Sequence, residues 1–260
     1  MIYLKTYFYV EHEIKFLHMN LIEAYNHIDA FIICEFNRTH TGMPREFFNR
    51  EEVLKTFPQD MLDKVLYLQC DISKMSVEAY ENEDAIHSVN EPVMRSAFMR
   101  AVDFNDEDII ISVDADEIIY EKSYEKIIEE VNTNSVVQLK LHQFYYKMTY
   151  LWEDKDFIAP TAAKYYVYKN SFPCNWRYEG KLLDDYFGCH FSWCMSPKEM
   201  VYKLHTYSHP KYRFCADEKL LEKAIEDKLY PFDDGTNFKI KELPKTSELL
   251  PRSIFKLNLL

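Results

Sequence analysis

The sequence predicts an α/β protein with a mixed, mostly parallel central sheet that is flanked by helices. Segments with strand and helix patterns alternate through the first half of the chain, as they do in βαβ units. The segment from Ile109 to Val113 is rich in β-branched residues and needs cover on both faces, which is typical of a central strand. The chain has 260 residues, 47% of them hydrophobic and 28% charged, so one full core can form. We therefore expect a single domain over residues 1–260.

The elements of the first half follow from local patterns. Strands are expected at residues 2–10, 30–36, 64–69 and 108–113. Helices are expected at residues 13–25, between the first two strands, and at 87–102, before the fourth strand. In the first helix, Ile14, Leu17 and Leu21 recur on one face. In the second helix, Ala97 and Ala101 recur at helical spacing. The second half is less regular, with strands expected at residues 136–141 and 164–168 and a helix at 216–229.

Composition excludes several classes of protein. Only 4 glycines occur, and no Gly-rich phosphate loop is present. The formal net charge of −12 disfavours nucleic acid or an anionic lipid surface as a partner. No apolar run approaches the ~20 residues that a membrane-spanning helix needs. The sequence does not indicate an oligomeric state.

Polar residues begin abruptly where the expected central strand ends, in Asp114-Ala115-Asp116-Glu117. Open α/β sheets bind their ligands at the carboxyl ends of their strands. Residues i and i+2 of an extended segment point the same way, so Asp114 and Asp116 can reach a single cation. Hard carboxylate oxygens suit Mn²⁺ or Mg²⁺. This Asp-x-Asp (DXD) motif therefore predicts a divalent-cation site.

Two other interpretations of the motif stay open. It could be an acidic surface turn, since Asp-x-Asp is a common tripeptide. It could also belong to a phosphatase of the Asp-x-Asp-x-Thr type, although Ile118 stands where that threonine is needed.

Two further polar clusters carry candidate site residues. The first, at residues 35–44, follows the apolar strand residues Phe31 to Cys34, and a carboxylate such as Glu35 can accept hydrogen bonds from a ribose or a base edge. The second, at residues 187–194, contains His190 and is followed by Lys203. A polar loop and a structural histidine are the simpler interpretations of these two clusters.

Taken together, the three clusters resemble glycosyltransferase family 17, the family of the β-1,4-mannosyl-glycoprotein 4-β-N-acetylglucosaminyltransferase. The segments that carry the resemblance, in order, are EFNRTHTGMP, DADEI, GCHFSWC, KL and YSHPKYRF, starting at residues 35, 114, 188, 203 and 207. The resemblance runs from about Phe8 to about Lys241. Cys189 departs from it, because the family usually has tryptophan at this position.

The resemblance implies a GT-A-type, metal-dependent, inverting transferase. Its expected donor is a UDP-sugar, with GlcNAc as the sugar. Its expected acceptor is a glycan or glycoprotein, and its expected cofactor is Mn²⁺ or Mg²⁺. Residues 1–120 would then form the nucleotide-sugar-binding half, and residues 121–260 the acceptor-side half with the C-terminal elements. Animal members carry a Golgi membrane anchor, whereas this chain begins at the catalytic domain. We therefore expect a soluble, cytoplasmic protein of a bacterium or of a virus-infected host cell.

The resemblance also implies roles for individual residues. Asp114, Asp116 and His209 are the expected metal ligands, with His190 as the competing histidine. The expected donor-binding residues are Glu35, Asn37, Arg95, Asp114 and Lys203.

Inversion needs a general base for the acceptor hydroxyl. His190, Glu179, Asp184 and Asp185 are candidates, and spacing alone does not choose among them. A metal-dependent phosphoryl hydrolase and a catalytically inactive sugar-binding module remain alternatives to the transferase.

Overall fold

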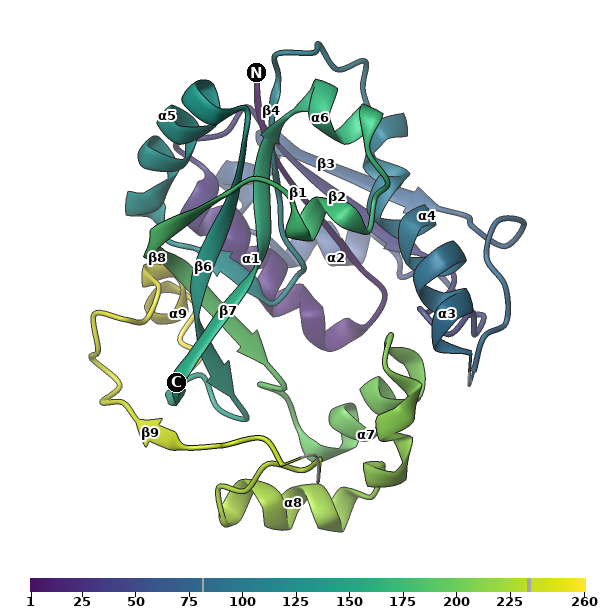
Figure 1. The fold of residues 1–260 in the computed structure, drawn as a ribbon, viewed down its shortest axis with the longest axis vertical. Helices are drawn as coiled ribbons and strands as arrows, with labels where there is room; N and C mark the ends of the chain where they lie inside the picture. Colours follow the sequence, from purple (N-terminus) through teal and green to yellow (C-terminus); the bar gives the residue numbers. More distant parts are fainter. Residues whose placement is uncertain (81, 233–234) are drawn as a thin grey trace.

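The computed structural model describes residues 1–80, 82–232 and 235–260. Its centre is one sheet with the strand order β3-β2-β1-β4-β7-β6-β8-β5, and β9 pairs with β7 (Figure 1). The strands are β1 (Ile2–Phe8), β2 (Ala30–Phe36), β3 (Val65–Cys70), β4 (Ile109–Ser112), β5 (Glu117–Ile119), β6 (Val136–Tyr145), β7 (Tyr150–Lys164), β8 (Lys181–Ser192) and β9 (Ile240–Glu242).

The sheet is mixed, which confirms the predicted fold class. Strands β3, β2, β1 and β4 run parallel to one another. Strand β7 is antiparallel to both β4 and β6, β8 is parallel to β6, and β5 is antiparallel to β8. Because β1, β2 and β4 end at the same edge of the sheet, the polar segments that follow them meet there.

Helices cover both faces of this sheet. They are α1 (Ile14–Ala24), α2 (Arg50–Thr56), α3 (Glu83–Ala85), α4 (Glu91–Ser96), α5 (Tyr124–Asn134), α6 (Tyr165–Asn170), α7 (Pro197–Thr206), α8 (Glu218–Glu226) and α9 (Arg252–Lys256). A π-helical turn at Ile86–Asn90 joins α3 to α4, and a 3₁₀ turn at Asn175–Tyr178 precedes β8. No helix within the described ranges has the length and apolar character to cross a membrane.

Alternating residues of the central strands fill two cores. Leu4 and Phe8 of β1 pack in a cluster with residues of α1 and α5. Tyr3 and Tyr7 point to the opposite face and pack in a second cluster with residues of α4 and α6. This two-residue alternation is the period of a strand with both faces covered.

The structure corrects the prediction of a strand at residues 164–168. Strand β7 ends at Lys164, and the chain then turns into α6. The run of aromatic and β-branched residues favours a strand locally. Tertiary contacts override this preference, because the buried hydroxyl of Tyr168 donates to the carbonyls of Ile110 and Thr161 at 3.2 and 3.0 Å. The helix predicted at 87–102 is divided into a π turn, α4 and a 3₁₀ turn.

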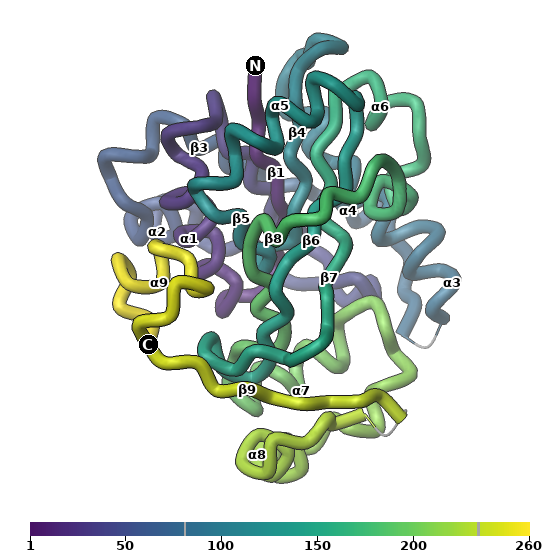
Figure 2. Tube along the Cα trace, turned by 60° about the vertical axis from the view of Figure 1, so that its left-hand side comes forward, coloured from purple at the N-terminus to yellow at the C-terminus, as the bar shows by residue number. Residues whose placement is uncertain are grey.

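The C-terminal segment returns to the first helix of the chain (Figure 2). It runs past β9 to α9, where the amide of Ser253 donates to the carboxylate of Glu23 at 2.7 Å. Ile254 is buried against a cluster that includes Phe16 of α1. The C-terminal segment is thus anchored to α1.

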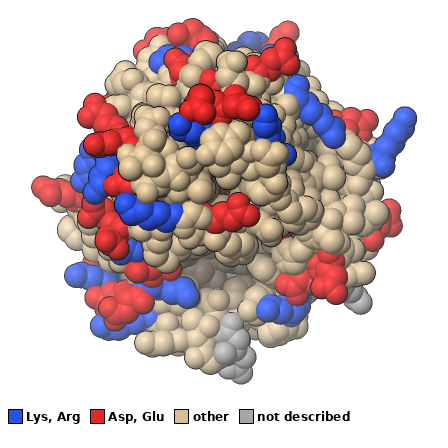
Figure 3. Space-filling view, turned by 45° about the horizontal axis from the view of Figure 1, so that its top comes forward, with Lys and Arg blue, Asp and Glu red and all other residues tan. Residues whose placement is uncertain are grey.

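Acidic and basic side chains are mixed on the face drawn in Figure 3. Lys and Arg lie among Asp and Glu around the edge of this face, and much of its middle consists of residues that are neither acidic nor basic. On this face the net negative charge therefore does not form one continuous acidic field.

Candidate active site

The acidic segment 114–117 forms a tight turn between β4 and β5. The amide of Asp114 donates to the Glu117 carboxylate at 2.8 Å, and the amide of Glu117 donates to the Asp114 carbonyl at 3.0 Å. Strand β5 pairs with β8, and the amide of Phe191 donates to the carbonyl of Asp116 at 2.8 Å. These backbone contacts hold the two aspartates beside the end of β8.

Asp114 is held between two arginines. Its Oδ1 lies 3.0 Å from Arg95 Nη1, and its Oδ2 lies 2.7 Å from Arg177 Nη1. Arg95 also binds Glu91, at 2.6 and 2.8 Å, and Arg177 also pairs with Glu117. Burial by itself would raise the pKa of Asp114, but the two guanidinium groups outweigh it and hold the pKa well below its ordinary value. Asp114 is therefore ionised, and both of its oxygens have cationic partners.

Asp116 has looser contacts. Its Oδ2 lies 3.4 Å from Nζ of Lys203 on α7, and its Oδ1 lies 3.6 Å from Nε2 of His190 on β8. Burial opposes ionisation here too, yet the positive charge of Lys203 counters it, and the pKa of Asp116 stays well below its ordinary value. Asp116 is thus an ionised carboxylate whose oxygens are not closely bonded.

The ring of His190 is oriented by its neighbours. Its Nδ1 lies 2.8 Å from Oε1 of Gln143, and an amide oxygen only accepts, so Nδ1 carries the proton. The ring also lies against Phe157, with 3.7 Å between the centroids. In the neutral ring, the lone pair on Nε2 then faces Asp116.

Two adjoining cavities open on this group of residues. The first has a volume of about 240 Å³, and its lining includes Asp114, Asp116, His190, Lys203 and several aromatic side chains. The second has a volume of about 540 Å³ and is lined in part by Arg95 and Arg177. Asp114, Phe157, Ser208 and His209 line both cavities.

Two groups near the acidic turn, one half-buried and one buried, have strongly shifted pKa values. Burial raises the pKa of Glu13, which lines the first cavity, to about 8, although Lys203 acts in the opposite direction. Burial lowers the pKa of Lys5 to about 7, and the positive charge of Arg95 adds to this effect. A carboxyl group and an amine that titrate near neutral pH are typical of functional sites.

Two of the predicted donor-binding residues lie outside both cavities. Glu35 is fully buried, and its carboxylate accepts hydrogen bonds from Arg45, the Phe48 amide, Tyr67 and Gln69 at 2.7–3.1 Å. The Asn37 side chain bonds to residues of the 71–73 loop. In this structure, Glu35 therefore holds the segment after β2, and Asn37 joins that segment to the loop after β3.

The predicted catalytic and metal-binding residues are also separated. His209 lines both cavities, but its Nδ1 lies 2.9 Å from Oε1 of Glu83 rather than against the aspartates. Asp185 is exposed and pairs with Lys126. Glu179 and Asp184 line neither cavity. Of the candidate bases, His190 is the one that contacts the acidic turn.

Sequence patterns did not indicate Arg177 and gave Glu13 no chemical role. Arg177 lies in a short 3₁₀ turn with no periodic pattern, 63 residues after Asp114 in the chain. Glu13 stands at the start of α1, where an acidic residue is ordinary helix chemistry. Only the fold brings either side chain to the acidic turn.

Comparisons with known proteins cover most of the chain. A crystal structure titled S. aureus TarS 1-349 is similar over 86% of this chain and 73% of that chain, with 8% identity and a TM-score of 0.44. A comparison with curated proteins gives no match. The sequence model of Glycosyltransferase family 17 matches residues 7–236, a range that holds the acidic turn, β8 and α7. Because that match spans most of the chain, the protein belongs to glycosyltransferase family 17.

Proposed function

We propose that this glycosyltransferase moves GlcNAc from a UDP-sugar to a glycan or glycoprotein acceptor, with inversion and with a divalent cation. One observation carries the proposal: two ionised aspartates and three cationic side chains line two adjoining cavities. The cavities have volumes of about 240 and 540 Å³, a size range that suits a nucleotide-sugar.

The donor set at Asp116 fits Mn²⁺ or Mg²⁺. Its carboxylate oxygens are 3.4 Å or more from their partners, and Nε2 of His190 lies beside them with its lone pair available. Such cations are commonly held by one or two carboxylates together with substrate phosphate oxygens. Asp114 fits less well, because Arg95 and Arg177 occupy both of its oxygens. We therefore assign the cation to Asp116 and His190, in place of the expected His209.

The arginines and Lys203 suit the diphosphate of the donor. Departure of UDP builds negative charge on that diphosphate, and fixed positive groups stabilise the charge in the transition state. Asp114 and Glu91 hold the guanidinium group of Arg95, so that it does not need to reorganise during the reaction. A bound cation would supply further neutralisation of the same charge.

Glu13 is our candidate for the general base. Its carboxylate lines the same cavity as Asp116, and its one close backbone contact is a long hydrogen bond from the Tyr9 amide at 3.3 Å. A carboxylate with a pKa of about 8 accepts a proton more readily than an ordinary one. His190 is then left to hold the cation.

Thermal unfolding tests the shared cation and donor site. If the diphosphate and Asp116 bind the same ion, UDP and Mn²⁺ together should raise Tm by more than the sum of their separate effects. Asp116→Asn should remove this excess. The matched control is Asp185→Asn, because Asp185 is exposed and lines neither cavity, so this variant should keep the excess. Additive shifts in the unaltered protein would contradict the proposal.

A further inference from the structure

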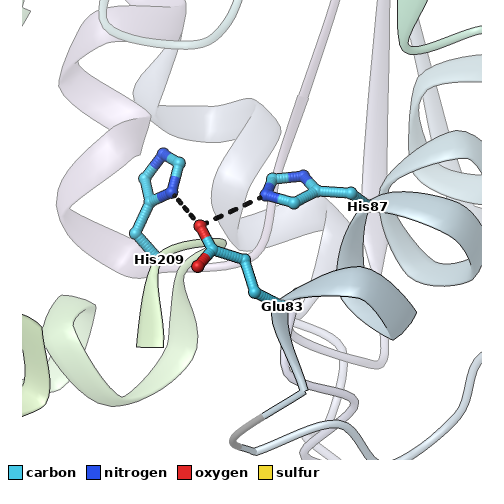
Figure 4. Close-up of side chains that lie close together, drawn as sticks. All are labelled: Glu83, His87 and His209. Carbon is cyan, nitrogen blue, oxygen red and sulfur yellow. Dashed lines mark hydrogen bonds and ion pairs between the residues drawn. The ribbon is translucent and has the colours of Figure 1, made fainter. Parts of the chain in front are cut away.

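A second group of ligand-type side chains lies beside the site just described. Glu83, His87 and His209 each offer one ligand atom, and these atoms all lie within 4.8 Å of one another. Figure 4 shows the Glu83 carboxylate between the two imidazole rings. Glu83 Oε1 is 2.9 Å from His209 Nδ1 and 3.6 Å from His87 Nε2. Two segments far apart in the sequence therefore converge on one carboxylate.

The His87 ring is held in place by a carboxylate on its far side. Its Nδ1 lies 2.7 Å from Oε2 of Glu91, and a carboxylate accepts the proton of that nitrogen. Nε2, the other ring nitrogen, faces Glu83 and is the atom that the ring offers to a metal. A carboxylate behind a histidine is the usual support of a metal-binding imidazole.

The spacing of the three atoms also suits a small cation. Metal–ligand bonds of about 2.0–2.1 Å in tetrahedral geometry place the ligand atoms about 3.3 Å apart. The two observed separations, 2.9 and 3.6 Å, lie on either side of this value. The side chains of Glu83, His87 and His209 are 35%, 38% and 45% exposed, so an ion can reach them from solvent.

We propose that Glu83, His87 and His209 bind a transition-metal ion, with Zn²⁺ as the best match. Two imidazoles and one carboxylate are a Zn²⁺-type donor set, whereas Mg²⁺ prefers oxygen ligands alone. His87 and His209 both line the second cavity, which leaves room for water at the remaining coordination position.

A metal ion at this site would link two parts of the protein. Glu83 and His87 come from the α3–α4 segment, and His209 follows α7. Glu91, which supports His87, also binds Arg95, and Arg95 pairs with Asp114. An ion on the three ligands would thus fix the segment that positions Arg95. The site does not share a ligand with the cation that we assign to Asp116.

Zinc binding to the Asp116→Asn variant tests the proposal, because that substitution removes the other candidate cation site. Isothermal titration with Zn²⁺ should give one equivalent bound, and Co²⁺ should give the visible absorption of a site with nitrogen ligands. His87→Ala and His209→Ala, each made in this background, should weaken Zn²⁺ binding by more than the roughly 10–100-fold that loss of a supporting group causes. Circular dichroism checks that each variant is folded.

His205→Ala is the matched control. His205 is exposed on α7, four residues before His209, and only its backbone carbonyl makes the described hydrogen bonds. This variant should bind Zn²⁺ as tightly as its parent. Equal Zn²⁺ affinity in all three histidine variants, or no binding to Asp116→Asn itself, would overturn the proposal.

Discussion

Replacing Lys5 with methionine should stabilise the protein by an amount that depends on pH. Lys5 lies in the middle of β1 and is 1% exposed, and its Nζ has no hydrogen-bond partner among the described residues. The rings of Phe98, Tyr7 and Trp176 lie 5.3, 5.8 and 5.9 Å from this nitrogen. The charged form of Lys5 is therefore buried without a hydrogen bond, and it is stabilised by the aromatic faces and by the negative charge of Asp114.

The pKa of Lys5 gives the size of the effect and its pH range. Burial lowers this pKa from 10.5 to about 7, so between those pH values the folded protein binds fewer protons than the unfolded chain. The free energy of unfolding then rises with pH across this range. At 1.36 kcal/mol per pKa unit, the shift corresponds to roughly 4–5 kcal/mol at pH 6. Attraction between the ammonium and the rings offsets part of this cost, so we expect Lys5→Met to gain about 3 kcal/mol at pH 6.

Urea unfolding of the two proteins at pH 6, 7.5, 9 and 10 measures this gain. The difference should be largest at pH 6 and should shrink steadily toward pH 10, because the unaltered protein loses its penalty as Lys5 gives up its proton. Lys256→Met is the control: Lys256 is exposed on α9, so its replacement should change stability by less than about 0.5 kcal/mol at every pH. A gain that does not vary with pH, or a loss of stability at pH 6, would refute the reasoning.

The remaining predictions concern the site and its supporting strands. Asp116→Asn should abolish sugar transfer while Tm falls by only a few degrees, since backbone hydrogen bonds fix the turn; a large fall in Tm would make Asp116 structural. If Glu13 is the base, the rate of sugar transfer should rise with pH to a plateau above about 8, and Glu13→Gln should lower kcat and remove this rise. The same pH–rate profile in Glu13→Gln as in the unaltered protein would exclude Glu13. Gly188→Ala should destabilise the fold by at least about 2 kcal/mol in urea unfolding, because the added Cβ would lie 2.0 Å from the Ile118 carbonyl oxygen. An unchanged midpoint of urea unfolding would contradict the pairing of β5 with β8.

Local patterns predicted the part of the fold that local sequence controls. The strand expected at residues 30–36 is β2 with the same bounds, and the helix expected at 13–25 differs from α1 by one residue at each end. The acidic turn was found because a buried strand ends in a sudden run of carboxylates, a signal contained in about ten adjacent residues. Alternation of strand and helix was enough to give the fold class.

Long-range contacts explain what sequence reasoning missed. Glu35 lies at the carboxyl end of β2, where ligand-binding residues are common, but Arg45 and Tyr67, from other parts of the chain, take its oxygens. The sequence favoured His209 over His190 as a metal ligand, but their distances from Asp116 depend on where β8 and α7 lie in the fold. Arg177 carries no local signal at all. Such residues are identified only by the tertiary structure.

Release of UDP from UDP-GlcNAc tests the central claim most directly. The protein is incubated with the donor, with and without N-glycan acceptors, after chelation and after addition of Mn²⁺. We expect UDP release that requires the ion, increases with an acceptor and is lost in Asp116→Asn. Release of UDP at the same rate in chelator and in Mn²⁺ would contradict the cation at Asp116. Absence of UDP release together with liberation of phosphate from small esters would contradict glycosyl transfer itself.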